Sequence, residues 1–171
     1  MSINWQRPDR REDGSARTLN ELLQEVIAAG IEDNKADALK YVRRKVPEEG
    51  WYQTRVMKHL RMWAKDHHYD CLVWKAAQGQ YARGGIADVL ALIGGVFLAV
   101  EVKRPLWGEL SELQKQFISD VNDCGGVAGS AVYIEDLQPL LEKLDAMARV
   151  TEYANDSGLE CSYDWGDPNV P

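Results

Sequence analysis

The chain has few of the residues from which disulfide frameworks and zinc sites are built. Among its 171 residues are three cysteines and three histidines, and no CxxC pair occurs. Cys71, Cys124 and Cys161 are an odd number, which favours reduced thiols. His67 and His68 are adjacent and would diverge on a helix, so they do not suit one metal ion. The sequence therefore argues against a disulfide-stabilised domain and against structural zinc.

Long hydrophobic runs are also missing. The apolar stretches are much shorter than the ~20 residues that a membrane-spanning helix needs. The first residues are rich in charge and lack the apolar core of a secretory signal. We therefore expect one domain with no membrane span, in the cytoplasm.

Positive charge is scarce in total but locally concentrated. The net charge is −7, yet residues 35–75 carry 10 basic and 5 acidic side chains, whereas residues 116–171 carry 2 and 11. A phosphate backbone could be bound by the basic segment. Its positive side chains include Lys40, Arg43, Arg44, Lys45, Arg55, Lys58, Arg61 and Lys65. Ordinary solvated helix faces would give the same pattern, so both interpretations stay open.

Hydrophobic periodicity predicts helices before and after a group of short strands. The expected order is helices at 18–29, 36–46 and 49–67, strands at 71–77, 86–93 and 96–103, helix 110–124, strand 127–134 and helix 135–147. This order predicts an α/β fold with a mixed sheet flanked by helices. It divides the chain into a helical N-terminal extension (1–46), a main domain (47–148) and an acidic C-terminal tail (149–171).

Two adjacent glycines, Gly94 and Gly95, separate two of these strands and indicate a two-residue hairpin. If they form the loop, every cross-strand pair has the same index sum, and Asp88 lies opposite Glu101. Directly opposed residues have Cβ atoms roughly 4.5–5.5 Å apart. Two carboxylates would then be close together on strands that are otherwise apolar.

Strand alternation places Lys103 on the same face as Glu101. Converging carboxylates are the hard oxygen ligands that Mg²⁺ or Mn²⁺ prefers, and a neighbouring lysine could orient water and stabilise charge on phosphorus. A chance pair on an exposed face, with Lys103 as an ion-pair partner, is the alternative. Charges within apolar strands are costly without a partner or a task, which favours the catalytic interpretation.

Four motifs of the sequence occur together in one known group of enzymes. They are Gly85-Ile-Ala-Asp88, Glu101-Val-Lys103, Leu110-Ser-Glu-Leu-Gln114-Lys115 and Cys124-Gly-Gly126. Their combination, over about residues 47–145, resembles the VRR-NUC family of virus-type replication-repair nucleases within the PD-(D/E)xK superfamily. One difference is Ala87, where the family usually has proline.

The resemblance implies a restriction-endonuclease-like fold and a Mg²⁺-dependent endodeoxyribonuclease, with Mn²⁺ expected to substitute. Asp88, Glu101 and the Val102 carbonyl would bind the ion, and Lys103 would lie beside the attacking water. A third acid on the preceding helix, four positions before Gln53, matches Glu49.

Local alternatives exist for the helix residues that the resemblance adds. Glu48 is the rival for the third acid, and either glutamate could instead be an ordinary first-turn acid that favours the helix dipole. Gln114 matches a helix glutamine that faces the family's site. It would also complete a capping box with Ser111, so local helix stabilisation explains it almost equally well.

The resemblance also suggests the partners. Branched or Holliday-junction DNA would be the substrate, in DNA repair or recombination of phage type in a bacterial host cell, and the enzyme would be a homodimer. Trp107 is a candidate for substrate contact. DNA contacts are expected at Lys75, Arg83, Arg104, Lys115, Arg55 and Lys58. The alternatives are a restriction-like or recombination endonuclease on duplex DNA, and a DNA-binding or phage-interaction protein without catalysis.

Overall fold

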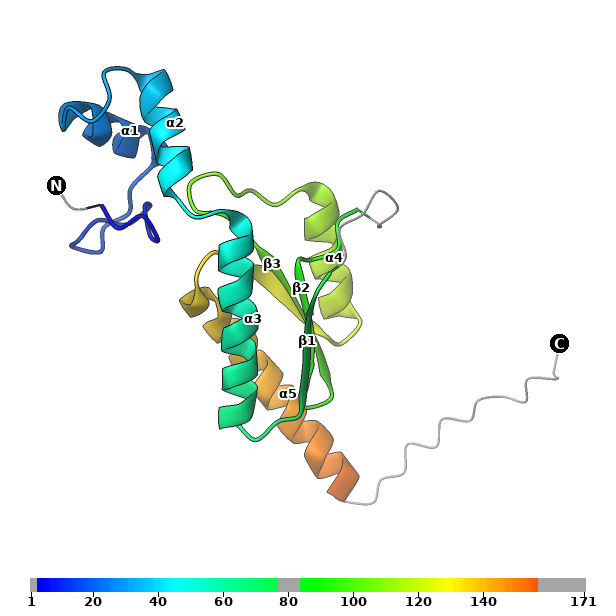
Figure 1. Cartoon of the computed structure of the whole chain (residues 1–171). Coiled ribbons are helices and arrows are strands. Elements are labelled where there is room, and N and C mark those ends of the chain that lie inside the picture. Colours follow the sequence, from blue (N-terminus) through cyan, green and yellow to red (C-terminus); the bar gives the residue numbers. More distant parts are fainter. Residues whose placement is uncertain (1–2, 77–83, 157–171) are drawn as a thin grey trace.

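The computed structural model describes residues 3–76 and 84–156 (Figure 1). Its elements are α1 (Leu19–Ala28), α2 (Lys35–Lys45), α3 (Glu49–Asp66), β1 (Cys71–Lys75), β2 (Val89–Ile93), β3 (Val96–Val102), α4 (Glu112–Asp123), β4 (Val127–Ala131), η1 (Ile134–Leu137) and α5 (Gln138–Asp156). Within these described ranges no helix has both the length and the apolar character that crossing a membrane requires.

The strands form one mixed sheet in the order β1-β2-β3-β4, antiparallel except for the parallel pair of β3 and β4. One face packs against α3 and α5 and forms the main hydrophobic core. The other face packs against α4 (Figure 1). The predicted α/β arrangement of a mixed sheet flanked by helices is therefore confirmed.

The hairpin between β2 and β3 turns at Gly94 and Gly95, whose φ angles are 55° and 80°. Positive φ at both central residues is the requirement of a type I′ turn, which explains two consecutive glycines. Val89 pairs with Val100, so the predicted index sum is confirmed along β2. Asp88 directly precedes β2, and its carbonyl oxygen accepts a hydrogen bond of 2.9 Å from the Ala76 amide.

The face beneath α4 is made of small residues. Ala87, Ala99 and Ala128 are buried there, and Phe117 and Val121 of α4 pack on them. Small side chains leave room for a helix close to the sheet, so the first turn of α4 lies near the edge at which β3 ends. Ser111 caps this helix in a capping box, as predicted.

The N-terminal helices form a small packed unit of their own. Leu22, Val26 and Val42 are fully buried between α1 and α2. Thr18 caps α1 in a capping box, and Asn34 caps α2. Leu106 and Trp107, from the loop after β3, pack against the same cluster. The extension is thus attached to the main domain at the loop that follows Glu101 and Lys103.

The last helix differs from the prediction. It was expected at 135–147, but η1 comes first and α5 then continues to Asp156. The expected boundary of the acidic tail at residue 149 therefore lies inside a helix, because the apolar spacing of Leu141, Leu144 and Ala148 carries the core-facing stripe further. Residues 157–171, with Cys161, lie outside the described residues.

Candidate active site

Asp88, directly before β2, and Glu101, on the neighbouring β3, are both buried acids. Their exposed fractions are only 6% and 2%. The Val102 amide donates a hydrogen bond of 3.0 Å to Asp88 Oδ2, so this carboxylate lies against the backbone of β3. The pairing of β2 with β3 places both acids at the same end of the hairpin, as the sequence predicted.

Glu101 is bound on one side by two other predicted residues. Lys103 Nζ lies 2.7 Å from Glu101 Oε1, and Gln114 Nε2 donates to the same oxygen at 2.5 Å. Glu101 Oε2 is buried and has no hydrogen-bond partner. A buried carboxylate oxygen without a donor is costly, and a bound cation would remove that cost.

Gln114 serves the helix and the site together. Its Oε1 accepts hydrogen bonds from the Ser111 amide at 2.9 Å and from Lys103 Nζ at 3.0 Å, while its Nε2 binds Glu101. The two interpretations left open by the sequence are therefore compatible. The capping box fixes the rotamer that presents the amide to the acid–lysine pair.

Gly85 allows α4 to come this close. Its φ is +89°, and a Cβ built on it would lie 2.8 Å from Leu113 Cβ and 2.9 Å from the Leu113 carbonyl oxygen. Any larger residue would therefore push away the turn that carries Gln114. The close approach of α4 thus explains why the Gly85-Ile-Ala-Asp88 motif begins with glycine.

Glu49 is the first residue of α3, and its pKa responds to the charge of Asp88. Its pKa is raised, first by burial and then by the negative charge of Asp88. Lys103, a hydrogen bond from the Arg104 backbone and Lys75 act in the opposite direction. Glu48 has an 83% exposed side chain and lies 3.5 Å from the Arg104 guanidinium. The charge of Asp88 therefore acts on Glu49, whereas Glu48 is exposed and pairs with Arg104, which favours Glu49 as the third acid.

The pKa of Glu101 is raised. Burial is the largest cause, and the charges of Asp88 and Glu49 add to it, against the hydrogen bond and charge of Lys103. Gln53, one turn after Glu49, is also buried, and its Oε1 lacks a partner. Glu101 Oε2 is thus an unpaired oxygen in a region of negative charge, which suits a cation.

The donor set fits a hard divalent cation bound by few protein ligands. Asp88 and Glu101 supply carboxylate oxygens, and the Val102 carbonyl stays a predicted third ligand. No group of three or more His, Cys, Asp or Glu side chains is close enough to hold an ion within residues 3–76 and 84–156. Glu49 therefore influences the site by its charge at the present geometry. Mg²⁺ commonly binds through one or two carboxylates and several waters, which agrees with this set.

The predicted DNA-contact residues are distributed differently. Lys75 at the end of β1, and Arg55 and Lys58 on α3, are exposed. The Arg55 guanidinium lies over the Trp51 ring at 4.7 Å, and Lys115 forms an exposed ion pair with Glu112 at 2.7 Å. The roles of these residues in DNA binding stay predictions.

Three further residues were assigned to DNA from the sequence. Arg104 binds backbone carbonyls at the α2–α3 junction. Trp107 packs into the N-terminal cluster with Arg104 over its ring, which makes it unsuitable as an open stacking surface. Arg83 lies outside the described residues.

Sequence analysis missed an exposed tryptophan on the catalytic face of the sheet. Trp74 pairs with Leu90, and Leu72 pairs with Leu92. Alternation along β2 puts Leu90 on the face of Asp88. Trp74 is 37% exposed and Leu72 is 62% exposed, because α4 covers only the β3–β4 half of this face. No sequence signal marks which half of a sheet stays open.

Comparisons with known proteins give one likeness to a solved structure. No family model matches the chain, and no curated protein matches it. A solved structure titled "VRR_NUC domain" is similar at 21% sequence identity, over 51% of this chain and 95% of that one, with a TM-score of 0.38. The residues of the site are therefore the basis for the function proposed below.

Proposed function

We propose that this chain is a divalent-metal-dependent DNA endonuclease. The observation that carries the proposal is the pair of buried acids, Asp88 directly before β2 and Glu101 on the adjacent β3, with Lys103 ion-paired to Glu101. Buried like charges destabilise a fold unless they serve a task. Two carboxylates with a lysine beside them have the composition that metal-assisted hydrolysis of a phosphodiester needs.

Each residue has a role that follows from its contacts. Asp88 and Glu101 would hold Mg²⁺, or Mn²⁺ in its place. The ion would supply Lewis-acid stabilisation of the phosphate and a more acidic bound water. Lys103 is held by Glu101 and Gln114, so its ammonium group is oriented before substrate binds. It can direct the attacking water and stabilise negative charge as it develops on phosphate oxygens.

We further propose that the substrate is branched DNA with unpaired nucleotides close to the cleaved bond. The open half of the catalytic face supports this, because Trp74 and Leu72 offer an apolar surface beside the acids. Exposed aromatic rings bind unpaired bases by stacking, whereas bases inside a duplex are already stacked. Cleavage of plain duplex DNA by a restriction-like enzyme is the alternative.

Cleavage of labelled DNA tests the proposal. Wild type is incubated with a four-way junction, a flap, a single strand and a matched duplex in Mg²⁺, Mn²⁺ or EDTA. We expect metal-dependent cutting that favours the branched substrates, and a loss of at least about 100-fold in Glu101→Gln. Glu142→Gln is the matched control, because Glu142 is an exposed acid on α5 far along the chain from the site.

Two outcomes would favour another function for this chain. Equal cutting of duplex and junction would support the restriction-like alternative. DNA binding without cutting under any condition would support a binding protein. Homodimerisation, which would let two strands be cut together, is a separate proposal. It is checked by the mass in solution with and without junction DNA, where a single protomer throughout would refute it.

A further inference from the structure

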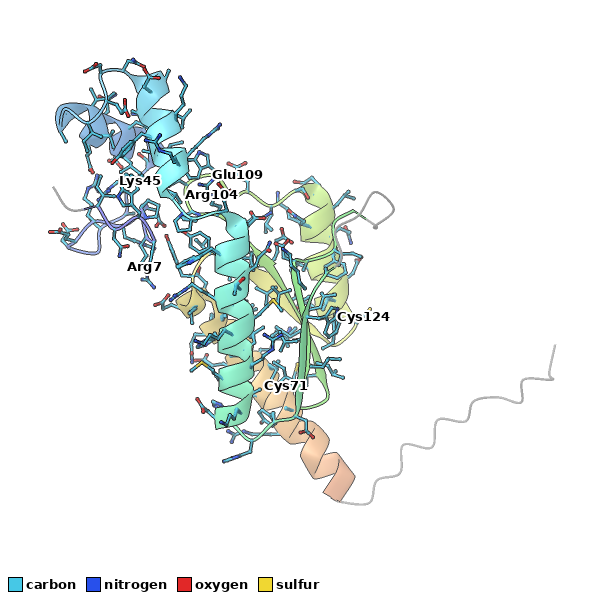
Figure 2. The ribbon with its side chains drawn as sticks, viewed as in Figure 1. Arg7, Lys45, Cys71, Arg104, Glu109 and Cys124 are labelled. Atoms are coloured by element: carbon cyan, nitrogen blue, oxygen red, sulfur yellow. The ribbon has the colours of Figure 1, made fainter. Side chains whose placement is uncertain are left out.

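Arg104, directly after Lys103, connects the catalytic strand to the junction between α2 and α3. Its Nε donates to the Pro47 carbonyl at 2.9 Å, and its Nη2 donates to the Arg43 and Val46 carbonyls, each at 2.6 Å. The guanidinium also lies over the Trp107 ring at 4.7 Å. Figure 2 shows Arg104 beside Lys45, where the N-terminal unit meets the main domain.

These carbonyls need donors that their own helix cannot supply. The last carbonyls of an α-helix have no intrahelical partner, and a cation at this end also suits the helix dipole. α2 ends at Lys45, and Val46 is its C-cap. The planar guanidinium with its five donors can bind several carbonyls at once, which a lysine ammonium on a flexible stem does less well. Arg104 therefore fixes the end of α2 from a distant part of the chain.

The start of α3 depends on the same contact. Its N-cap, Glu48, makes no side-chain capping hydrogen bond, so local sequence does not fix the first turn. Glu48 instead lies 3.5 Å from Arg104 Nη1. Arg104, two residues after the end of β3, thus holds the two residues, Pro47 and Glu48, that lead directly into Glu49 and α3.

We propose that Arg104 is a positioning residue, which sets the place of Glu49 relative to Asp88 and Glu101 by fastening the α2–α3 junction to the chain just after β3. The inference rests on the proposed function of these acids. It replaces the expected phosphate contact of Arg104, because its donors already bind three carbonyls in the protein. It also makes the N-terminal helical unit part of the active-site framework, since two of those carbonyls come from the end of α2.

A double-mutant cycle between Arg104→Ala and Glu49→Gln tests this role. Cleavage of labelled junction DNA is measured for kcat and KM separately, at a temperature where circular dichroism shows every variant folded. Arg104→Ala is expected to lower kcat by on the order of 10–100-fold, with KM changed little, because a displaced acid affects chemistry more than DNA binding. In the Glu49→Gln background the same change is expected to cost almost nothing more.

Other outcomes would overturn the proposal. Full additivity of the two changes would show that Arg104 does not act through Glu49. A rise in KM with unchanged kcat would show a phosphate contact instead. Arg104→Lys is expected to stay impaired, since a single ammonium cannot span the three carbonyls, and full rescue by lysine would mean that charge alone matters.

Arg7→Ala is the matched control. Arg7 also ties the N-terminal segment to the main domain, through an ion pair with Glu135 and contact with the Tyr133 ring at 4.8 Å, and neither of these partners belongs to α3. We expect its kcat to stay within about twofold of wild type, because catalytic geometry is unchanged. An equal loss of kcat in Arg7→Ala would show that loosening the N-terminal segment at any point lowers activity.

The same four proteins can also be compared without a cleavage assay. Thermal unfolding at several pH values shows how much Glu49 contributes to the pH dependence of stability, with Arg104 present or replaced. An inactive wild type would refute the proposed function. Coupling of Arg104 to the Glu49 contribution would still support the positioning role, and its absence would refute it.

Discussion

Gln114 Nε2 and Glu101 Oε1 lie 2.5 Å apart, although one residue belongs to α4 and the other to β3. The same amide group completes the capping box with Ser111, so helix capping and site geometry depend on one rotamer. Substitutions can separate the role of Gln114 in helix capping from its role in binding Glu101.

Gln114→Glu is expected to keep the cap and damage the site. Glutamate also forms a capping box with serine, so stability should be nearly retained. A carboxylate cannot donate to Glu101, and we expect cleavage to fall about 10–100-fold. Ser111→Ala should do the reverse and cost about 1 kcal/mol of stability while most of the cleavage rate remains. Thermal unfolding measures the stability of the two variants, and initial rates measure their cleavage. If stability and cleavage fall together in both variants, the capping and active-site roles of Gln114 are not separable.

Glu49 should make stability depend on pH in a direction fixed by its raised pKa. A carboxyl whose folded pKa exceeds its unfolded value stabilises the fold at low pH and loses that contribution as pH rises through the folded pKa. The stability of wild type relative to Glu49→Gln should therefore fall in EDTA as pH rises above about 4, the ordinary pKa of a glutamate. Thermal unfolding of both proteins measures this difference. A rising difference would mean that Glu49 is stabilised as an anion.

The sequence predicted the acid–lysine arrangement because the hairpin is short. A two-residue loop leaves one register, and register with strand alternation fixes the neighbours of Asp88, Glu101 and Lys103. The third acid could not be chosen between Glu48 and Glu49, because a helix start is uncertain by a residue or two and both acids follow Pro47.

Arg104 and Trp74 show what sequence reasoning could not foresee. Arg104 was predicted to contact DNA, and the three carbonyls that it binds lie 57 to 61 residues earlier in the chain. Every residue has a backbone carbonyl, so the sequence does not show which carbonyls a distant arginine will bind. Only the folded structure shows this contact. Trp74 looked like an ordinary strand residue, because its exposure depends on how far α4 extends over the sheet.

Gly85→Ala should separate α4 from the sheet. Positive φ alone costs a non-glycine residue about 1 kcal/mol, and the contact of 2.8 Å with Leu113 adds to this. Gly125→Ala is the matched control, because Gly125 has φ +82° and no atom within 4 Å of its built Cβ. We expect Gly85→Ala to lower both the melting temperature and the cleavage rate, and Gly125→Ala to lower the melting temperature alone. Equal cleavage by the two variants would show that the approach of α4 does not matter.

Trp74→Ala tests whether the open half of the sheet selects unpaired nucleotides. Loss of stacking is expected to cost about 1–3 kcal/mol of binding per base, which appears as a raised KM for junction and flap DNA. Because Trp74 is partly exposed at a sheet edge, the change in stability should be much smaller than for a core tryptophan. Trp74→Phe should recover most of the affinity, since a ring still stacks, whereas Leu72→Ala removes apolar area without removing a ring. If Leu72→Ala raises KM as much as Trp74→Ala does, the surface acts by hydrophobic contact, and stacking is not the basis of substrate choice.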